Sequence, residues 1–316
     1  MLDKKEVIGT SHAKIIVIGE HSVVYGQPAI ALPLSAVGIT VKVASGKEDG
    51  PIIKSSYYTG KVCDLPQKML GTKQLLEELL RGVPESQKQI EISIQSTIPA
   101  ERGMGSSAAV AIAIVRAVFR FYGWRLSEQQ LLNLANISEI ETHNNPSGLD
   151  AATAASSSPV WMIRDKEIES IPINSTGYLL ICDSGILGQT KEAIQIVRNK
   201  LDQSPENATA LLYELGLLTK KVKQYLSQNQ LEKLGNAFKS AQTDLKSLGV
   251  SLPKIDKLIE ISYKNGSLGS KITGGGRGGC FFCLLPTREK AENLAKIMKA
   301  HGVTQTWIEP LSARKE

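Results

Sequence analysis

The chain has 316 residues, of which 42% are hydrophobic and 22% are charged, and its formal net charge at pH 7 is +6. This length and composition predict a globular protein with two domains, or one large domain with a deep cleft. The positive charge suits an anionic ligand such as a nucleotide phosphate, although it is ordinary for this length. Nucleic acid is not expected as a partner, because the basic residues are spread out and no run of them alternates with aromatic residues.

The sequence also argues against a membrane protein and against a metal-binding cysteine cluster. The N-terminal segment lacks the apolar core of a signal peptide, and no uninterrupted apolar stretch approaches the roughly 18 residues of a membrane span. Cys280 and Cys283 form a C-x-x-C, but two phenylalanines separate them and no second pair completes a zinc site. We therefore predict buried thiols on a strand and a cytoplasmic protein.

In chain order, the first half mixes strands with helices. Hydrophobic patterning predicts strands at 15–18, 29–34, 39–43, 89–96, 160–163 and 178–183. Helices are predicted at 107–121 and from 127 to about 143, the second opened by a capping box of Ser127 and Gln130. The small residues of 151–159 predict a loop.

The second half is predicted to be rich in helices, with few strands. Helices are expected at 192–200, 208–226, 231–248, 254–264 and 288–301, and strands at 280–285 and 304–308. This mixture predicts an α+β fold with domains 1–175 and 176–316. No internal repeat of solenoid period is visible.

Three segments are rich in glycine and small residues: Lys14–Gly26, Pro99–Ala109 and Lys271–Cys280. None contains the Walker A pattern of a P-loop. The second follows a predicted strand and opens a predicted helix, so its backbone N–H groups suit phosphate; a plain serine N-cap is the alternative.

The third glycine-rich segment contains a weak dinucleotide-binding pattern. Residues Gly274–Gly279 fit G-x-G-x-x-G, but a strand is predicted after them where a dinucleotide fold has a helix. The glycines instead predict close approach of backbone to a ligand or another loop.

The candidate catalytic groups are two carboxylates and one lysine. Glu139 and His143 lie four residues apart on a predicted helix and share one face. Asp150 comes just after residues 145–148, which end this predicted helix, and a carboxylate on a tight loop near a glycine-rich phosphate site is a candidate general base. A helix cap or a surface acid is the alternative for Asp150. Lys14 precedes a predicted strand and could lie beside the phosphate site, but a single lysine is not evidence of a catalytic role.

Together these segments resemble the GHMP kinases, whose three motifs occur in this order, and the resemblance covers essentially the whole chain. Residues 14–26 and 139–150 look like the mevalonate kinase form, and residues 100–105 look most like those of Gram-positive bacteria. The resemblance implies an N-terminal domain like the second domain of ribosomal protein S5, a helix-rich C-terminal α/β sandwich, and an active site in the cleft between them. It also implies transfer of phosphate from ATP to the primary hydroxyl of mevalonate, and homodimers are frequent in the family.

The same resemblance implies roles for individual residues. Asp150 falls at the catalytic base, Lys14 at a lysine that steadies the transferring phosphoryl group, and Ser107 and Glu139 at the Mg²⁺ ligands. Mevalonate contacts are implied for Glu20 and His21, and Thr190 is a further candidate. Two loops are also implied: the ATP phosphate loop is Glu101, Arg102, Gly103, Met104, Gly105, Ser106 and Ser107, and the closing loop contains Gly274, Gly275 and Gly276. A kinase of another small alcohol or of phosphomevalonate, and an inactive binding protein of the same fold, are the alternatives.

Overall fold

The computed structural model describes residues 6–99, 102–143 and 146–312. It contains two compact units, each made of several chain segments. The first unit comprises Met1–Ala13, Val37–Pro99 and Gly105–Ala155, and the second comprises Lys14–Ala36, Ala100–Met104 and Ser156–Glu316. Two long strands, β1 (Glu6–Ile18) and β2 (Pro28–Ser45), contribute residues to both units. Because the units follow the chain discontinuously, consecutive domains 1–175 and 176–316 stay a prediction.

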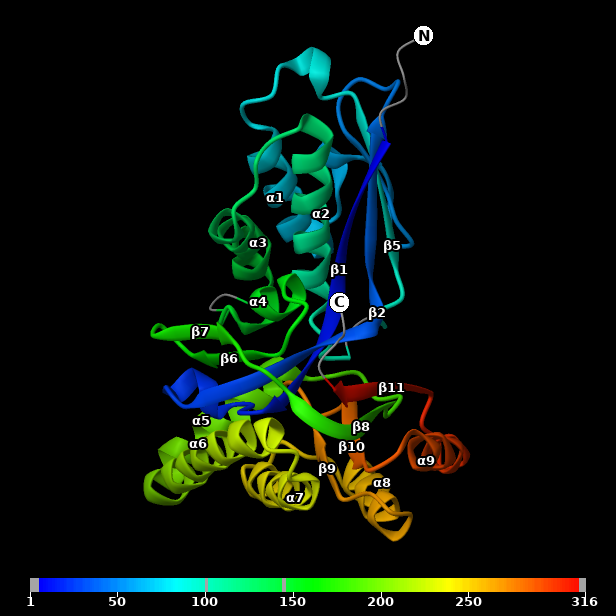
Figure 1. The fold of residues 1–316 in the computed structure, drawn as a ribbon. Coiled ribbons are helices and arrows are strands. Elements are labelled where there is room, and N and C mark those ends of the chain that lie inside the picture. The colour runs from blue at the N-terminus through cyan, green and yellow to red at the C-terminus, as the bar shows by residue number, and fades with distance from the viewer. Residues whose placement is uncertain (1–5, 100–101, 144–145, 313–316) are drawn as a thin grey trace. The chain divides into compact units, whose positions relative to one another are not determined.

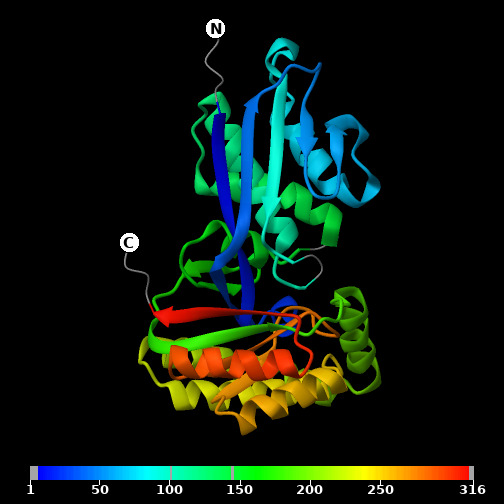
Figure 2. The same cartoon turned by 90° about the vertical axis from the view of Figure 1, so that its right-hand side faces the viewer.

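The first unit is a sheet covered by helices. Strands β3 (Ile52–Lys54), β4 (Thr59–Lys61) and β5 (Ile90–Ser96) join β2 in the order β4-β3-β5-β2, and β1 pairs with β2. Figure 2 shows β1, β2 and β5 side by side with helices behind them. The helices are α1 (Leu70–Leu80), α2 (Ser106–Tyr122), α3 (Glu128–His143) and α4 (Leu149–Ala155), with short 3₁₀ turns at Val62–Asp64, Gln67–Met69 and Glu85–Gln87.

Local sequence explains how these helices form. The apolar residues of α2 are almost all buried, which is why this alanine-rich stretch stays helical against the sheet. The predicted capping box of α3 is confirmed: the Gln130 backbone N donates to Ser127 Oγ over 3.2 Å, and the Ser127 backbone N donates to Gln130 Oε1 over 3.1 Å.

The second unit contains a four-stranded antiparallel sheet in the order β11-β8-β10-β9. Its strands are β8 (Asn174–Asp183), β9 (Gly269–Ile272), β10 (Cys280–Leu285) and β11 (Gln305–Ser312). Helices α7 (Leu231–Ser247), α8 (Pro253–Lys264) and α9 (Arg288–Ala300) lie along one face of this sheet (Figure 1). All six residues of β10 are buried, which confirms the predicted burial of Cys280 and Cys283.

The remaining elements of the second unit surround this sheet. They are the 3₁₀ turn η1 (Ser22–Tyr25), strands β6 (Val160–Ile163) and β7 (Glu167–Ser170), and helices α5 (Thr190–Gln203) and α6 (Pro205–Ser227). Strand β6 pairs with the first residues of β2 and with β7. The Ser35 hydroxyl donates to Glu309 Oε1 over 2.9 Å, which ties the middle of β2 to β11.

Most predicted elements are present, and the α+β class is confirmed, but two predictions were wrong. The expected strands 29–34 and 39–43 form the single strand β2. Its backbone stays extended while its pairing partner changes from β6 to β5. The expected loop 151–159 begins as helix α4, since alanine favours helix and small side chains let α4 pack on α2 and α3. Elements α1, β3, β4, β7 and β9 were not predicted. Within the described ranges, none of the helices is long and apolar enough to span a bilayer.

Candidate active site

Helix α2 begins inside the second glycine-rich segment, at Ser106. Gly105 is its N-cap, with φ +70°, and Ser106 and Ser107 stand in the first turn. The alternative of a serine N-cap is therefore wrong, because the N-cap is a glycine and makes no side-chain cap bond. A first turn whose N-cap offers no side-chain acceptor is an arrangement that favours an anion. Glu101 lies outside the described residues.

The two predicted carboxylates of the first unit lie on helices that pack against α2. Glu139 is in α3 and only 3% exposed, whereas Asp150 is in the first turn of α4 and half-buried. Helices α2, α3 and α4 contact one another pairwise, so the structure gathers the helices that carry Ser107, Glu139 and Asp150 (Figure 1). The side chain of His143 lies outside the described residues.

Lys14 lies in the second unit, beside the other part of the phosphate-loop segment. The residue is 3% exposed, and its Nζ donates to the Gly103 carbonyl over 3.3 Å. Its backbone N donates to the Met104 carbonyl over 3.0 Å. Two bonds therefore fix this lysine against the loop, one through the main chain and one through the ammonium group.

Glu20 and Lys271 form an ion pair with no exposed side-chain surface. Lys271 Nζ donates to Glu20 Oε1 and, over 2.7 Å, to the Ile272 carbonyl, and it lies 5.2 Å from the centre of the Phe282 ring. Burial raises the pKa of Glu20, and the Lys271 ammonium opposes that rise. The pair links the turn after β1 to strand β9. Because Glu20 is buried in this way, its contact with substrate stays a prediction.

His21 and Thr190 meet at Gly275 of the third glycine-rich segment. His21 Nε2 lies 2.9 Å from the Gly275 carbonyl, which only accepts hydrogen bonds, so the imidazole carries its proton on Nε2. Burial lowers the pKa of His21 to about 4, so the ring is neutral at pH 7. A Cβ on Gly275 would lie 2.5 Å from Thr190 Oγ1, the side chain that opens α5. The structure therefore brings three of the predicted site residues together.

Arg102 is held by Asp183, at the end of β8. Arg102 Nε lies 2.9 Å from each carboxylate oxygen of Asp183, and Asp183 Oδ1 also accepts from the Gly185 N–H over 2.9 Å. Arg102 Nη1 is buried and has no hydrogen-bond partner among the described residues. The ion pair therefore fixes the guanidinium through Nε and leaves Nη1 without a partner among the residues that the structure describes.

The third glycine-rich loop connects β9 to β10, so a strand follows it and the rejection of a dinucleotide fold is confirmed. A Cβ added to Gly274, Gly276, Gly278 or Gly279 would lie between 2.1 and 3.1 Å from a carbonyl oxygen of another segment. Those oxygens belong to Gly103, Val250, Leu187 and Arg102. The predicted reason for the glycines, close approach to another loop, is therefore confirmed.

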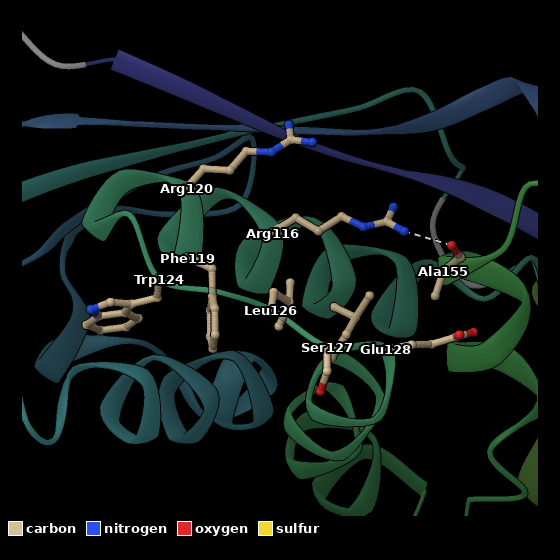
Figure 3. Close-up of a pocket in the computed structure, with 9 residues that line it drawn as sticks. Arg116, Phe119, Arg120, Trp124, Leu126, Ser127, Glu128 and Ala155 are labelled. Atoms are coloured by element: carbon tan, nitrogen blue, oxygen red, sulfur yellow. Dashed lines mark hydrogen bonds between the residues drawn. The ribbon is translucent and has the colours of Figure 1, made fainter.

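A hollow of about 420 Å³ lies over the C-terminal half of α2, at the opposite end of that helix from Ser107. Figure 3 shows Phe119, Leu126 and Trp124 at this hollow, with the side chains of Arg116 and Arg120 extended from α2. Both guanidinium groups bond backbone: Arg116 donates to the Thr10 and Ala155 carbonyls over 2.7 Å each, and Arg120 donates to the Ile8 carbonyl. These arginines therefore stabilise β1 and the end of α4.

Sequence reasoning assigned no role to Lys271, Thr273 or Asp183, although each contacts a predicted site residue or its strand. No local pattern marks them, because each partner lies more than 80 residues away along the chain. Among the described residues, no group of three His, Cys, Asp or Glu side chains is placed to hold a metal ion.

Comparison with known proteins gives the family. The model of the GHMP kinase N-terminal domain matches residues 69–158, and that of the GHMP kinase C-terminal domain matches residues 222–304. The mevalonate kinase of Pyrococcus horikoshii is 32% identical over 308 residues, covering 90% of each chain, and that of Thermococcus gammatolerans is 31% identical over 94% of each.

Solved structures agree with this. The crystal structure of mevalonate kinase from methicillin-resistant Staphylococcus aureus is 30% identical, with a TM-score of 0.75 over 98% of this chain and 100% of that one. The L. major mevalonate kinase, solved in complex with R-mevalonate, has the same fold, with 21% identity and a TM-score of 0.86 over 98% of each chain. Since the Pyrococcus, Thermococcus and Staphylococcus relatives are about equally similar to this chain in sequence, the Gram-positive type stays a prediction. The chain belongs to the GHMP kinase family and, within it, to the mevalonate kinases.

Proposed function

We propose that this chain transfers the γ-phosphoryl group of ATP to the C5 hydroxyl of (R)-mevalonate, giving 5-phosphomevalonate and ADP in the mevalonate pathway of isoprenoid biosynthesis. The observation that carries the proposal is the 32% identity to a mevalonate kinase over 90% of both chains. The glycine N-cap of α2 and the buried Lys14 of β1, which is bonded to the loop before α2, support it, because phosphoryl transfer depends mainly on positioning and on stabilising charge.

We infer that Asp150 accepts the proton of the C5 hydroxyl and that Lys14 stabilises the negative charge on the transferring phosphoryl group. An aspartate is a weak base, so it takes the proton late, once bond formation to phosphorus has made the hydroxyl acidic. The backbone N–H groups from Gly105 to Ser107 bind phosphate oxygens, and Arg102, in the same glycine-rich segment, carries a positive charge that Asp183 fixes. Contacts of Glu20, His21 and Thr190 with mevalonate are part of the same proposal.

Ser107 and Glu139 fit a magnesium ion chemically. Mg²⁺ takes oxygen ligands and is typically held by one or two protein groups together with substrate phosphates and water. The Ser107 hydroxyl and the Glu139 carboxylate are two oxygen donors on helices that pack together. When bound with ATP, the ion would neutralise charge on the phosphates. A homodimer and a cytoplasmic location stay predictions.

An ADP-release assay separates this function from its alternatives. Purified protein with ATP and Mg²⁺ is given mevalonate, phosphomevalonate, galactose or homoserine, and kcat/KM is measured for each. We expect mevalonate to give by far the highest kcat/KM. Preference for another alcohol would assign a different kinase of the same fold, and ATP binding without ADP release from any substrate would indicate a binding protein.

The role of Asp150 has its own test. We expect Asp150→Asn to fold normally and to lose about 10²- to 10⁴-fold in kcat, the usual contribution of a general base. The matched control is Asp64→Asn, which removes an exposed aspartate of the same unit and is expected to keep wild-type turnover. If Asp150→Asn keeps near wild-type kcat, Asp150 is not the base.

A further inference from the structure

Thr273, the residue after β9, forms hydrogen bonds to the backbone of β1 in the way that a neighbouring strand would. Its Oγ1 accepts a hydrogen bond from the Ile16 backbone N over 2.9 Å and donates one to the Ile16 carbonyl, also over 2.9 Å. The Thr273 residue is 1% exposed. One hydroxyl therefore satisfies both backbone groups of Ile16, as a neighbouring strand would, and it does so two residues after Lys14.

The next residue extends the same contact to the phosphate-loop segment. Gly274 approaches Gly103 so closely that a Cβ on Gly274 would lie 3.1 Å from the Gly103 carbonyl oxygen. That carbonyl is the acceptor of the Lys14 ammonium group. The contacts form a closed circuit from Lys14 Nζ through Gly103, Gly274 and Thr273 to Ile16, and back along β1 to Lys14.

This circuit restrains the two ends of a long side chain. Thr273 fixes the strand from which Lys14 projects, and the close approach of Gly274 to Gly103 limits movement of the carbonyl to which the Lys14 ammonium group is bonded. A lysine has a flexible four-carbon stem, so its ammonium position depends on both restraints. Catalytic groups must be held to within a fraction of an ångström of the productive geometry.

We propose that Thr273 is a positioning residue for phosphoryl transfer, which acts through β1 to hold the Lys14 ammonium in place. The proposal rests on the proposed function, because it assumes that Lys14 stabilises the transferring phosphoryl group. It assigns no contact between Thr273 and either substrate. Its consequence is that loss of the hydroxyl disturbs the chemical step more than the binding of ATP or mevalonate.

Two substitutions isolate the hydroxyl. Thr273→Val keeps the shape and removes the hydrogen bonds, whereas Thr273→Ser keeps the hydroxyl and is the matched control. With thermal unfolding measured for each variant and assays run well below both transitions, we expect Thr273→Val to lose about 10- to 100-fold in kcat. KM for ATP and for mevalonate is expected to change less than about twofold, and Thr273→Ser to stay within about twofold of wild type in kcat.

A double-mutant cycle with Lys14→Met tests whether Thr273 acts through Lys14. If Thr273 acts through Lys14, Thr273→Val lowers kcat in the wild-type background and lowers it no further in the Lys14→Met background. If Thr273→Val does not fold, Gly274→Ala, which breaks the circuit at the next contact, takes its place in the cycle. An unchanged kcat in Thr273→Val, or the same fold loss in both backgrounds, overturns the proposal. An unchanged kcat in Lys14→Met instead overturns the role given to Lys14 in the proposed function.

Discussion

His21 makes the stability of the fold depend on pH within a defined window. Burial lowers the pKa of its imidazole from 6.5 to about 4, and the ring donates to the Gly275 carbonyl in its neutral form. The unfolded chain takes up this proton at its ordinary pKa and the folded chain does not. Stability from this group is therefore complete above pH 6.5 and is lost as the pH falls to about 4. At about 1.4 kcal/mol per pH unit, we expect a loss of about 2.5 kcal/mol between pH 7.5 and pH 4.5.

His21→Asn removes the titrating imidazole and puts in its place an amide that does not titrate. His21 has φ +59° and ψ −46°, outside the left-handed helical region, so the backbone strain at this position is shared by the histidine and the asparagine, and the asparagine amide is still a donor. The free energy of unfolding is measured by urea denaturation at pH 7.5, 6 and 4.5 for both proteins. Taking the difference between wild type and variant cancels the titration of every other group.

We expect this difference in the free energy of unfolding to move by about 2.5 kcal/mol in favour of the variant as the pH falls to 4.5. His301→Asn, which removes an exposed histidine after α9, serves as the control for loss of a histidine outside the Gly275 contact. Parallel wild-type and His21→Asn stability curves from pH 7.5 to 4.5 would refute a buried, neutral His21.

Two further predictions concern stability and are tested by chemical denaturation. Gly276→Ala places a Cβ 2.4 Å from the Val250 carbonyl oxygen at φ +76°, whereas Gly266→Ala places one at φ +89° with no atom within 4 Å. We expect Gly266→Ala to cost about 1 kcal/mol from backbone strain and Gly276→Ala at least about 2 kcal/mol more; equal losses would contradict the packing argument. Ser127→Ala should lose about 1 kcal/mol by removing the N-cap of α3, and Ser127→Asp, which keeps a capping oxygen, should not; no loss in Ser127→Ala would mean that the capping box contributes nothing.

Local patterns predicted most of the fold because they report local physics. The capping box of α3 and the alternating strand β5 depend on residues within a few positions of one another, and both are present. The single strand β2 was not predicted, because its continuity depends on two partner strands that lie far along the chain. Helix α4 was missed for a different reason: small residues suit both a loop and a tightly packed helix, and only the packing on α2 and α3 decides between them.

The same distinction applies to the candidate site. Some of its residues were predicted from a local motif, whereas the residues that position them were not. Lys14, His21 and Gly275 stand in recognisable segments, and the structure gives each a defined contact. Thr273 and Lys271 lie in the third segment too, but their partners, Ile16 and Glu20, are more than 250 residues away.

From the sequence alone, Thr273 indicates only a strand, because it lies beside β-branched and glycine residues. Lys271, close to a run of glycines, indicates only a surface charge. Both are instead fully buried and bonded to the segment that carries Lys14. The third glycine-rich segment therefore stabilises the first. Its glycines allow neighbouring backbones to approach closely, and Thr273 and Lys271 bond to β1 and to the turn that follows it.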